Sequence, residues 1–153
     1  IPTMKIYDSE FDVWGDPERF PYVATTYRLT EHLTSGVMTR TLPYLAEAFA
    51  RHFCEIPREL AQEKGIRNGD WVEVESARGK VRVQAMVTNR LRPLRVGGRL
   101  TYLIGLPIHW GPNSGHVQGD ITNTLTPQAV DVNVQIQESK VFLANLRKVS
   151  GGE

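Results

Sequence analysis

The sequence has few of the features that stabilise or target a small protein by themselves. Cys54 is its one cysteine, which excludes an intrachain disulfide and a cysteine-based metal cluster. The longest apolar run, Tyr102 to Ile108, has seven residues, whereas a membrane-spanning helix needs about 20, so no membrane span is predicted. No signal peptide, lipidation motif or internal repeat is visible. At 153 residues, the chain is long enough for one domain with its own core.

Acidic residues are missing from one long stretch. Between Ala77 and Gly119 there is no aspartate or glutamate, whereas seven residues are basic: Arg78, Lys80, Arg82, Arg90, Arg92, Arg95 and Arg99. This segment could face a phosphate-bearing ligand or an acidic neighbour, or could form ordinary solvated loops. No aromatic residues alternate with these arginines as in a stacking platform, which argues against nucleic acid as a partner. The net charge of +1 identifies no partner.

The pattern of apolar residues predicts a mainly β fold with two short helices and long loops. Residues 1–20 show no period and are expected to form an irregular N-terminal arm, followed by a domain over 21–149 and a tail over 150–153. Strands are expected at residues 22–28, 53–56, 71–76, 80–88, 101–104 and 140–149, helices at 43–52 and 57–65, and a long loop at 105–127.

The clearest β pattern lies between residues 71 and 88. Two runs of alternating apolar and polar residues flank the turn at Ala77, Arg78 and Gly79. They predict an antiparallel hairpin inside a barrel, with Glu73 and Glu75 on the solvated face. The valines expected to face the core are Val72, Val74, Val81, Val83 and Val87.

The sequence completes no familiar catalytic template. Its histidines, His32, His52, His109 and His116, are never three or four residues apart, so no helical zinc site is predicted. The phosphate-binding glycine motifs and the Gly-x-Ser-x-Gly elbow are absent. Cys54 lies in an apolar run and is expected to be a buried thiol, not a nucleophile. No catalytic residue or metal ligand is therefore predicted.

Two polar loops are the strongest candidates for a binding site. Residues 26–40 offer backbone amides, hydroxyls, a guanidinium and an imidazole to a ligand rich in phosphate and heterocycle edges. In the second loop, formed by residues 108–111 and 123–126, Asn123 could bind a base edge and Trp110 could stack on a ligand or shield it. The polar residues of either loop alone could instead form turns and cap neighbouring elements, without binding a ligand.

The first loop, the Asn-x-Leu-Thr motif at 123–126 and Lys140 before the last strand together resemble a known domain. It is the C-terminal domain of the molybdenum and tungsten bis-pterin oxidoreductases, the dimethyl sulfoxide reductase family. The run Arg-Leu-Thr-Glu-His-Leu-Thr-Ser-Gly-Val-Met-Thr-Arg at 28–40 and Leu-Thr-Pro at 125–127 are most similar to catalytic subunits of respiratory-type formate dehydrogenases. The resemblance covers roughly residues 22–149. It implies a six-stranded double-psi β-barrel.

The resemblance also implies a ligand, bis-molybdopterin guanine dinucleotide with molybdenum or tungsten. The residues expected to contact its dinucleotide are Thr26, Tyr27, Arg28, Leu29, Thr30, Glu31, His32, Thr34, Ser35, Trp110, Asn123 and Lys140. Met38 and Thr39 are expected to support the loop. Ser139 stands where many relatives carry an aromatic residue, which puts one packing contact in doubt. Leu33-Thr34 follow His32 where nitrate reductases of the family usually have Trp-His, and this favours formate as the substrate.

The function implied by the resemblance is the oxidation of formate to carbon dioxide, with two electrons leaving through the metal. In that family the metal ligand (cysteine or selenocysteine), the catalytic histidine and arginine, and the ligands of a 4Fe-4S cluster lie in more N-terminal domains, so this segment alone carries no catalytic residues. The expected partners are the rest of the catalytic subunit and an iron–sulfur electron-transfer subunit. The periplasm is the expected location, with the cytoplasm as the alternative.

A second function of another class stays open at this point. The chain could be a stand-alone double-psi barrel that binds a protein or a nucleotide as a non-catalytic adaptor. Because the sequence opens on Ile1 and not on methionine, the expectation is that it forms one end of a longer protein.

Overall fold

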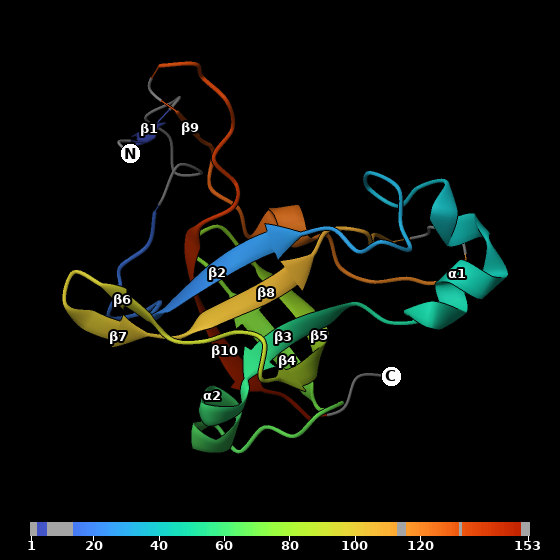
Figure 1. The fold of residues 1–153 in the computed structure, drawn as a ribbon, viewed down its shortest axis with the longest axis horizontal. Helices are drawn as coiled ribbons and strands as arrows, with labels where there is room; N and C mark the ends of the chain where they lie inside the picture. Colours follow the sequence, from blue (N-terminus) through green and yellow to red (C-terminus); the bar gives the residue numbers. More distant parts are fainter. Residues whose placement is uncertain (1–2, 6–13, 113–115, 132, 151–153) are drawn as a thin grey trace.

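The computed structural model describes residues 3–5, 14–112, 116–131 and 133–150. Six strands close into a barrel in the order β10-β2-β8-β3-β5-β4, and two short helices lie outside it (Figure 1). The strands are β1 (Thr3–Lys5), β2 (Tyr22–Tyr27), β3 (Phe53–Pro57), β4 (Trp71–Glu75), β5 (Lys80–Thr88), β6 (Leu94–Val96), β7 (Arg99–Thr101), β8 (Leu103–Pro107), β9 (Ala129–Asp131) and β10 (Phe142–Lys148). The helices are α1 (Pro43–Ala48) and α2 (Arg58–Glu63), with 3-10 turns η1 (Thr39–Thr41) and η2 (Thr122–Thr124).

The barrel mixes parallel and antiparallel pairs. Strand β2 runs parallel to β8, and β3 runs parallel to β5, whereas the other neighbouring strands of the barrel are antiparallel. A parallel pair needs a long connection: α2 and β4 lie between β3 and β5, and the elements from η1 to β7 lie between β2 and β8. The predicted mainly β fold, a six-stranded double-psi barrel with two short helices, is confirmed.

The predicted hairpin is confirmed as β4 and β5. Val72 pairs with Val83 and Val74 with Val81, and all four side chains are at most 1% exposed. Val87 is partly buried and packs against the same core. The alternation therefore identified the buried face of the hairpin correctly.

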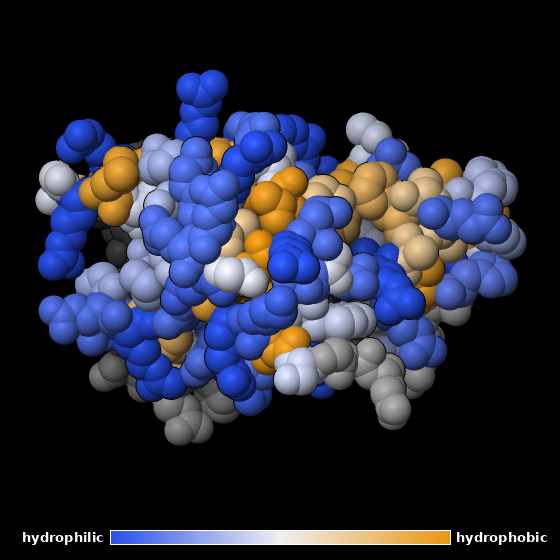
Figure 2. All heavy atoms as spheres, turned by 90° about the horizontal axis from the view of Figure 1, so that it is seen from below, coloured by the Kyte–Doolittle hydropathy of each residue, from blue (hydrophilic) through white to orange (hydrophobic). Residues whose placement is uncertain are grey.

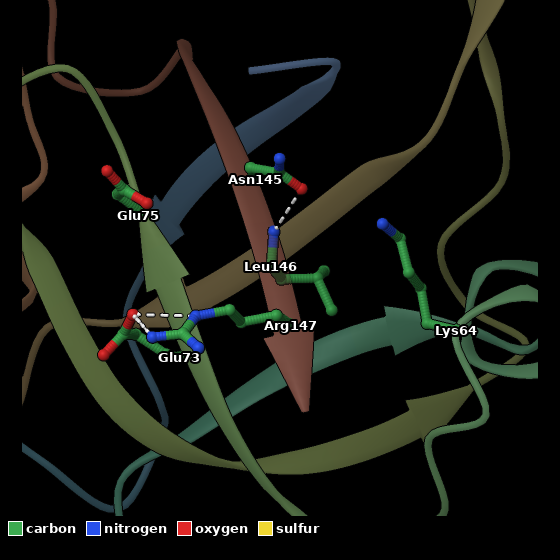
Figure 3. A pocket seen from close by; sticks show the side chains of 6 residues that line it. All are labelled: Lys64, Glu73, Glu75, Asn145, Leu146 and Arg147. Atoms are coloured by element: carbon green, nitrogen blue, oxygen red, sulfur yellow. Dashed lines mark hydrogen bonds and ion pairs between the residues drawn. The ribbon is translucent and has the colours of Figure 1, made fainter. Parts of the chain in front are cut away.

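The expectation that Glu73 is solvated is wrong. Its carboxylate is buried because β10 closes the barrel beside β4 and places Arg147 directly opposite it. Arg147 donates to the Glu73 Oε1 from Nη2 at 2.8 Å and from Nε at 3.1 Å (Figure 3). These hydrogen bonds hold the pKa of Glu73 below its ordinary value. Glu75, half-exposed, pairs with Arg19 at 2.8 Å.

Both helices are shorter than the sequence suggests. The first ends at Ala48, not at residue 52, because Phe49 leaves the helical conformation (φ −140°, ψ 78°); the His52 carbonyl then accepts a hydrogen bond from the Gln84 amide of β5 at 3.0 Å. The second begins at Arg58, since Pro57 belongs to β3. Gly65, at φ +64°, follows its last turn, as predicted.

Strand β8 begins and ends later than expected. The sequence predicts a loop from residue 105, yet Gly105 lies inside β8, paired with Thr25 of β2 and Glu55 of β3. A Cβ at this position would lie 2.8 Å from the Tyr27 ring, so the glycine permits a close approach of two strands. The loop expected at 105–127 therefore begins after Pro107 and contains η2. Strand β10 is similarly shorter than the predicted 140–149.

Two small sheets were not predicted. Strand β1, which falls in the expected irregular arm, pairs with β9, whereas residues 6–13 of that arm and 151–153 of the expected tail lie outside the described residues. Strands β6 and β7 form an exposed ribbon joined by Gly97 and Gly98, both at positive φ. The ribbon carries Arg95 and Arg99, so this part of the acid-free stretch is solvated.

Candidate functional site

The predicted first loop leaves the barrel at the end of β2, where Lys140 meets it. The ammonium of Lys140 donates to the Thr26 carbonyl at 2.8 Å, and the buried Thr26 hydroxyl donates to the Ser139 carbonyl at 3.2 Å. These contacts join residues more than 110 positions apart in the chain. Two predicted site residues, Thr26 and Lys140, are thus brought together.

Arg28, the first residue after β2, is a second cation and acts electrostatically on Lys140. Burial, and next the positive charge of Arg28, lower the pKa of Lys140. Among the described residues, no carboxylate forms an ion pair with either side chain. Two neighbouring cations without a carboxylate suit an anionic group such as a pyrophosphate.

Two buried residues, Arg40 and His109, hold the backbone of the loop through hydrogen bonds. Arg40, 4% exposed, donates to the Ser35 carbonyl at 3.0 Å and also to the His109 carbonyl. The imidazole of His109 accepts the Leu29 amide hydrogen at its Nε2, at 2.7 Å. Burial lowers the pKa of His109 to about 4, so the ring is neutral at pH 7. The loop is therefore anchored near both of its ends.

Thr39 supports the middle of the loop, as predicted. Its hydroxyl oxygen lies 3.0 Å from the His32 Nδ1 and accepts the Leu33 amide hydrogen at 3.3 Å. His32 is 5% exposed, so its ring packs under the loop and is not open to solvent. The loop instead exposes the side chains of Thr30, Thr34 and Ser35, with Glu31 partly exposed.

Trp110 does not offer an open ring face for stacking. It is 3% exposed and stacks on His52 with ring centroids 5.1 Å apart, while His32 and Phe53 contact it edge-on. The expectation that Trp110 stacks on a ligand is therefore wrong, because its ring lies in a buried aromatic cluster beside the loop, whereas the alternative, that it shields a ligand, stays a prediction. The cluster was not predicted, because its histidines lie far apart in the sequence; only the adjacent pair His109-Trp110 indicates it there.

Asn123 forms no hydrogen bond with the other predicted site residues in the described part of the chain. It is exposed in η2, where its carbonyl accepts the Thr126 hydroxyl at 3.1 Å. Arg78 of the acid-free stretch donates to the Thr126 carbonyl at 2.8 Å. No hydrogen bond within the described part of the chain links Asn123 to Lys140 or to the first loop, so its contact with a base stays a prediction.

A cleft of about 480 Å³ opens beside the start of the loop. It combines an apolar floor with the Glu55–Arg90 ion pair, in which Glu55 is 3% exposed. Its lining residues are Tyr27, Arg28, Leu29, Thr30, Glu31, Phe49, Phe53, Glu55, Met86, Val87, Thr88 and Arg90. A smaller cavity of about 120 Å³ lies against β4 and β10 (Figure 3), but its Glu73 and Arg147 are already paired with each other. The cleft of about 480 Å³ is the better candidate of the two because residues of the first loop line it.

The described residues contain neither a candidate metal site nor a helix that could cross a membrane. Within them, no group of three or more histidine, cysteine, aspartate or glutamate side chains could hold a metal ion. Over the same ranges, the helices are too short or too polar to cross a membrane. Cys54 is fully buried, which raises the pKa of its thiol, as expected for a core cysteine.

Comparison with known proteins decides the family. The family model of the molydopterin dinucleotide binding domain matches residues 22–143, which include the loop, Asn123 and Lys140. The chain belongs to this family. The match agrees with the resemblance read from the sequence and makes the chain a molybdopterin dinucleotide-binding domain.

Several relatives of this dinucleotide-binding domain are formate dehydrogenase subunits. The chain is 42% identical over 147 residues to the formate dehydrogenase subunit alpha of Megalodesulfovibrio gigas, and 45% identical over 147 residues to the nitrate-inducible formate dehydrogenase major subunit of Escherichia coli K12. Each match covers 96% of this chain but 14% of the relative, so the chain spans a small part of their length. The F420-dependent formate dehydrogenase 1 subunit alpha of Methanococcus maripaludis is 31% identical over 90% of the chain and 18% of its own length.

A solved structure supports the fold. Acetylene hydratase from Pelobacter acetylenicus superimposes with a TM-score of 0.65 over 87% of this chain and 19% of the hydratase, at 17% identity. At this identity the likeness concerns the barrel alone.

Proposed function

We propose that this chain is the C-terminal domain of a formate dehydrogenase catalytic subunit and binds the molybdopterin guanine dinucleotide there. Identities of 42% and 45% to two formate dehydrogenase subunits, each over 96% of the chain, support this. When bound, the cofactor supplies two-electron chemistry at molybdenum or tungsten, by which formate becomes carbon dioxide. The proposal places the metal ligand and a 4Fe-4S cluster in other parts of the subunit.

The observation that carries the proposal is the pair of cations at the end of β2. Arg28 and Lys140 would hold the pyrophosphate, because they form no ion pairs among the described residues and lie at the base of a polar loop. The exposed hydroxyls of Thr34 and Ser35 would add hydrogen bonds. The adjoining cleft of about 480 Å³ has room for a heterocycle.

We expect Lys140→Ala and Arg28→Ala each to weaken cofactor binding about ten- to hundredfold in the full enzyme. Each change removes a charge-assisted hydrogen bond of about 1.5–3 kcal/mol, and tenfold in affinity corresponds to about 1.4 kcal/mol. The measurement is the guanine nucleotide released from each purified variant. Arg92→Ala, an exposed arginine of the acid-free stretch, is the matched control and should keep its cofactor. Loss of cofactor from Arg92→Ala alone would contradict this placement.

An exposed apolar surface supports the expectation of a larger subunit. Leu33, Val37, Met38 and Leu42 are 38–63% exposed, and hydrophobic side chains gather at the end of the molecule that carries α1 (Figure 2). Contiguous exposed apolar surface is typical of interfaces. We propose that other parts of the catalytic subunit cover it. An iron–sulfur subunit as electron acceptor and a periplasmic location complete the proposal, by analogy with the respiratory-type enzymes.

A further inference from the structure

His109 contacts the first loop at its beginning and, through Arg40, at its end. Its side chain is fully buried, and its Nε2 accepts the Leu29 amide hydrogen at 2.7 Å. Its carbonyl accepts a hydrogen bond from Arg40, which also binds the Ser35 carbonyl. A Cβ on Gly36 would lie 2.7 Å from the same His109 carbonyl. His109 therefore helps to position the backbone from residue 29 to residue 36, together with Arg40 and Thr39.

The bond to Leu29 requires one protonation state of the imidazole. An amide hydrogen can be accepted only by an unprotonated Nε2, so the neutral ring must carry its proton on Nδ1. Protonation would place a hydrogen on Nε2, facing the Leu29 hydrogen, and the bond would be lost. The half-buried Leu29 amide would then lose its partner within the protein.

The surroundings of His109 favour the neutral ring. The charged and titratable groups acting on it are Arg28 at the end of β2, His32 in the loop, with its ring centroid 5.3 Å away, and Arg40 of η1. His52, before β3, faces it from across Trp110. All of these groups are cationic or become cationic in acid. The negative charge of Glu31 acts on His32, where it opposes the lowering of the pKa. A backbone hydrogen bond with Thr34 acts in the opposite direction and raises the pKa of His109.

We propose that His109 is a positioning residue that holds the dinucleotide-binding loop through the Leu29 amide and releases it on protonation. The identity of the ligand rests on the proposed function, whereas the hydrogen bond itself does not. Burial lowers the pKa of His109 from 6.5 to about 4, so between these values the displaced loop binds a proton that the closed loop does not. The closed loop is therefore fully favoured above about pH 6.5 and loses stability progressively as the pH falls towards 4.

The test compares two replacements of His109 in the full enzyme. The Oε1 of His109→Gln can accept the Leu29 hydrogen and does not titrate, whereas His109→Leu offers no acceptor. We expect His109→Leu to retain about tenfold less guanine nucleotide at pH 7 than wild type, and His109→Gln to retain it at both pH 7 and about pH 5. Wild type should lose cofactor at the lower pH. His116→Gln, an exposed histidine whose side chain forms no hydrogen bond among the described residues, should behave as wild type.

Hydrogen exchange of the Leu29 amide gives a readout that needs no cofactor. It should become about tenfold faster in His109→Leu and stay slow in His109→Gln. Unchanged exchange in His109→Leu, or acid loss of cofactor that persists in His109→Gln, would overturn the inference. If wild type carries no guanine dinucleotide at all, the proposed function fails, and the exchange of Leu29 still decides whether His109 holds the loop.

Discussion

Leu106→Ala is expected to lower the free energy of unfolding by about 2–5 kcal/mol, the range for removing a large aliphatic side chain from a core. Leu106 is fully buried in β8, where it pairs with Thr26 of β2. Because β8 bonds to both β2 and β3, the cavity would open between strands that close the barrel, where little collapse can relieve it. Urea unfolding should show a lower midpoint at an unchanged slope.

Leu100→Ala is the matched control for this change. Leu100 lies on β7 of the exposed ribbon and is 65% exposed, so its truncation should alter stability by no more than about 0.5 kcal/mol. Equal losses in the two variants would contradict the assignment of β8 to the centre of the core.

The fold could be predicted wherever a local pattern coincides with burial. The hairpin of β4 and β5 is an example, since every second residue of it faces the core. Errors occurred where a distant strand overrides the local pattern. The local pattern predicts that Glu73 lies at the surface. It is buried because β10, some 70 positions later in the chain, places Arg147 opposite it. The local pattern likewise predicts that Gly105 starts a loop, whereas it lies inside β8, where the absence of a Cβ permits its close approach to Tyr27.

The candidate site could be predicted only in part, for the same reason. The motif around residue 28 and Lys140 were identified from their resemblance to a family, and the structure joins Lys140 to Thr26. What positions the loop was not predicted, because the hydrogen bond from Leu29 to His109 spans 80 residues. No pattern in a single sequence indicates such a contact. The buried ring cluster around Trp110 was missed in the same way.

Gly36→Ala is expected to reduce cofactor binding by roughly a hundredfold or more, about 2.7 kcal/mol. Gly36 has φ +83°, which a residue with a Cβ adopts at a cost of about 1–2 kcal/mol. The added Cβ would also lie 2.7 Å from the His109 carbonyl oxygen, a distance that backbone atoms cannot absorb without moving. Since this carbonyl and the Ser35 carbonyl share Arg40, the displacement would pass directly into the loop. Guanine nucleotide content of the purified full enzyme measures the loss.

Gly69→Ala is the control that separates the effect of the close contact with the His109 carbonyl from the effect of backbone strain. Gly69 has nearly the same conformation, φ +85°, but a Cβ added there would meet no atom within 4 Å, and the residue lies before β4, away from the loop. Both variants should therefore lose about 1–2 kcal/mol of stability through strain, while only Gly36→Ala should lose the cofactor. Retention of cofactor in Gly36→Ala would mean that the loop tolerates displacement from His109. Its preformed shape would then not be what binds the dinucleotide.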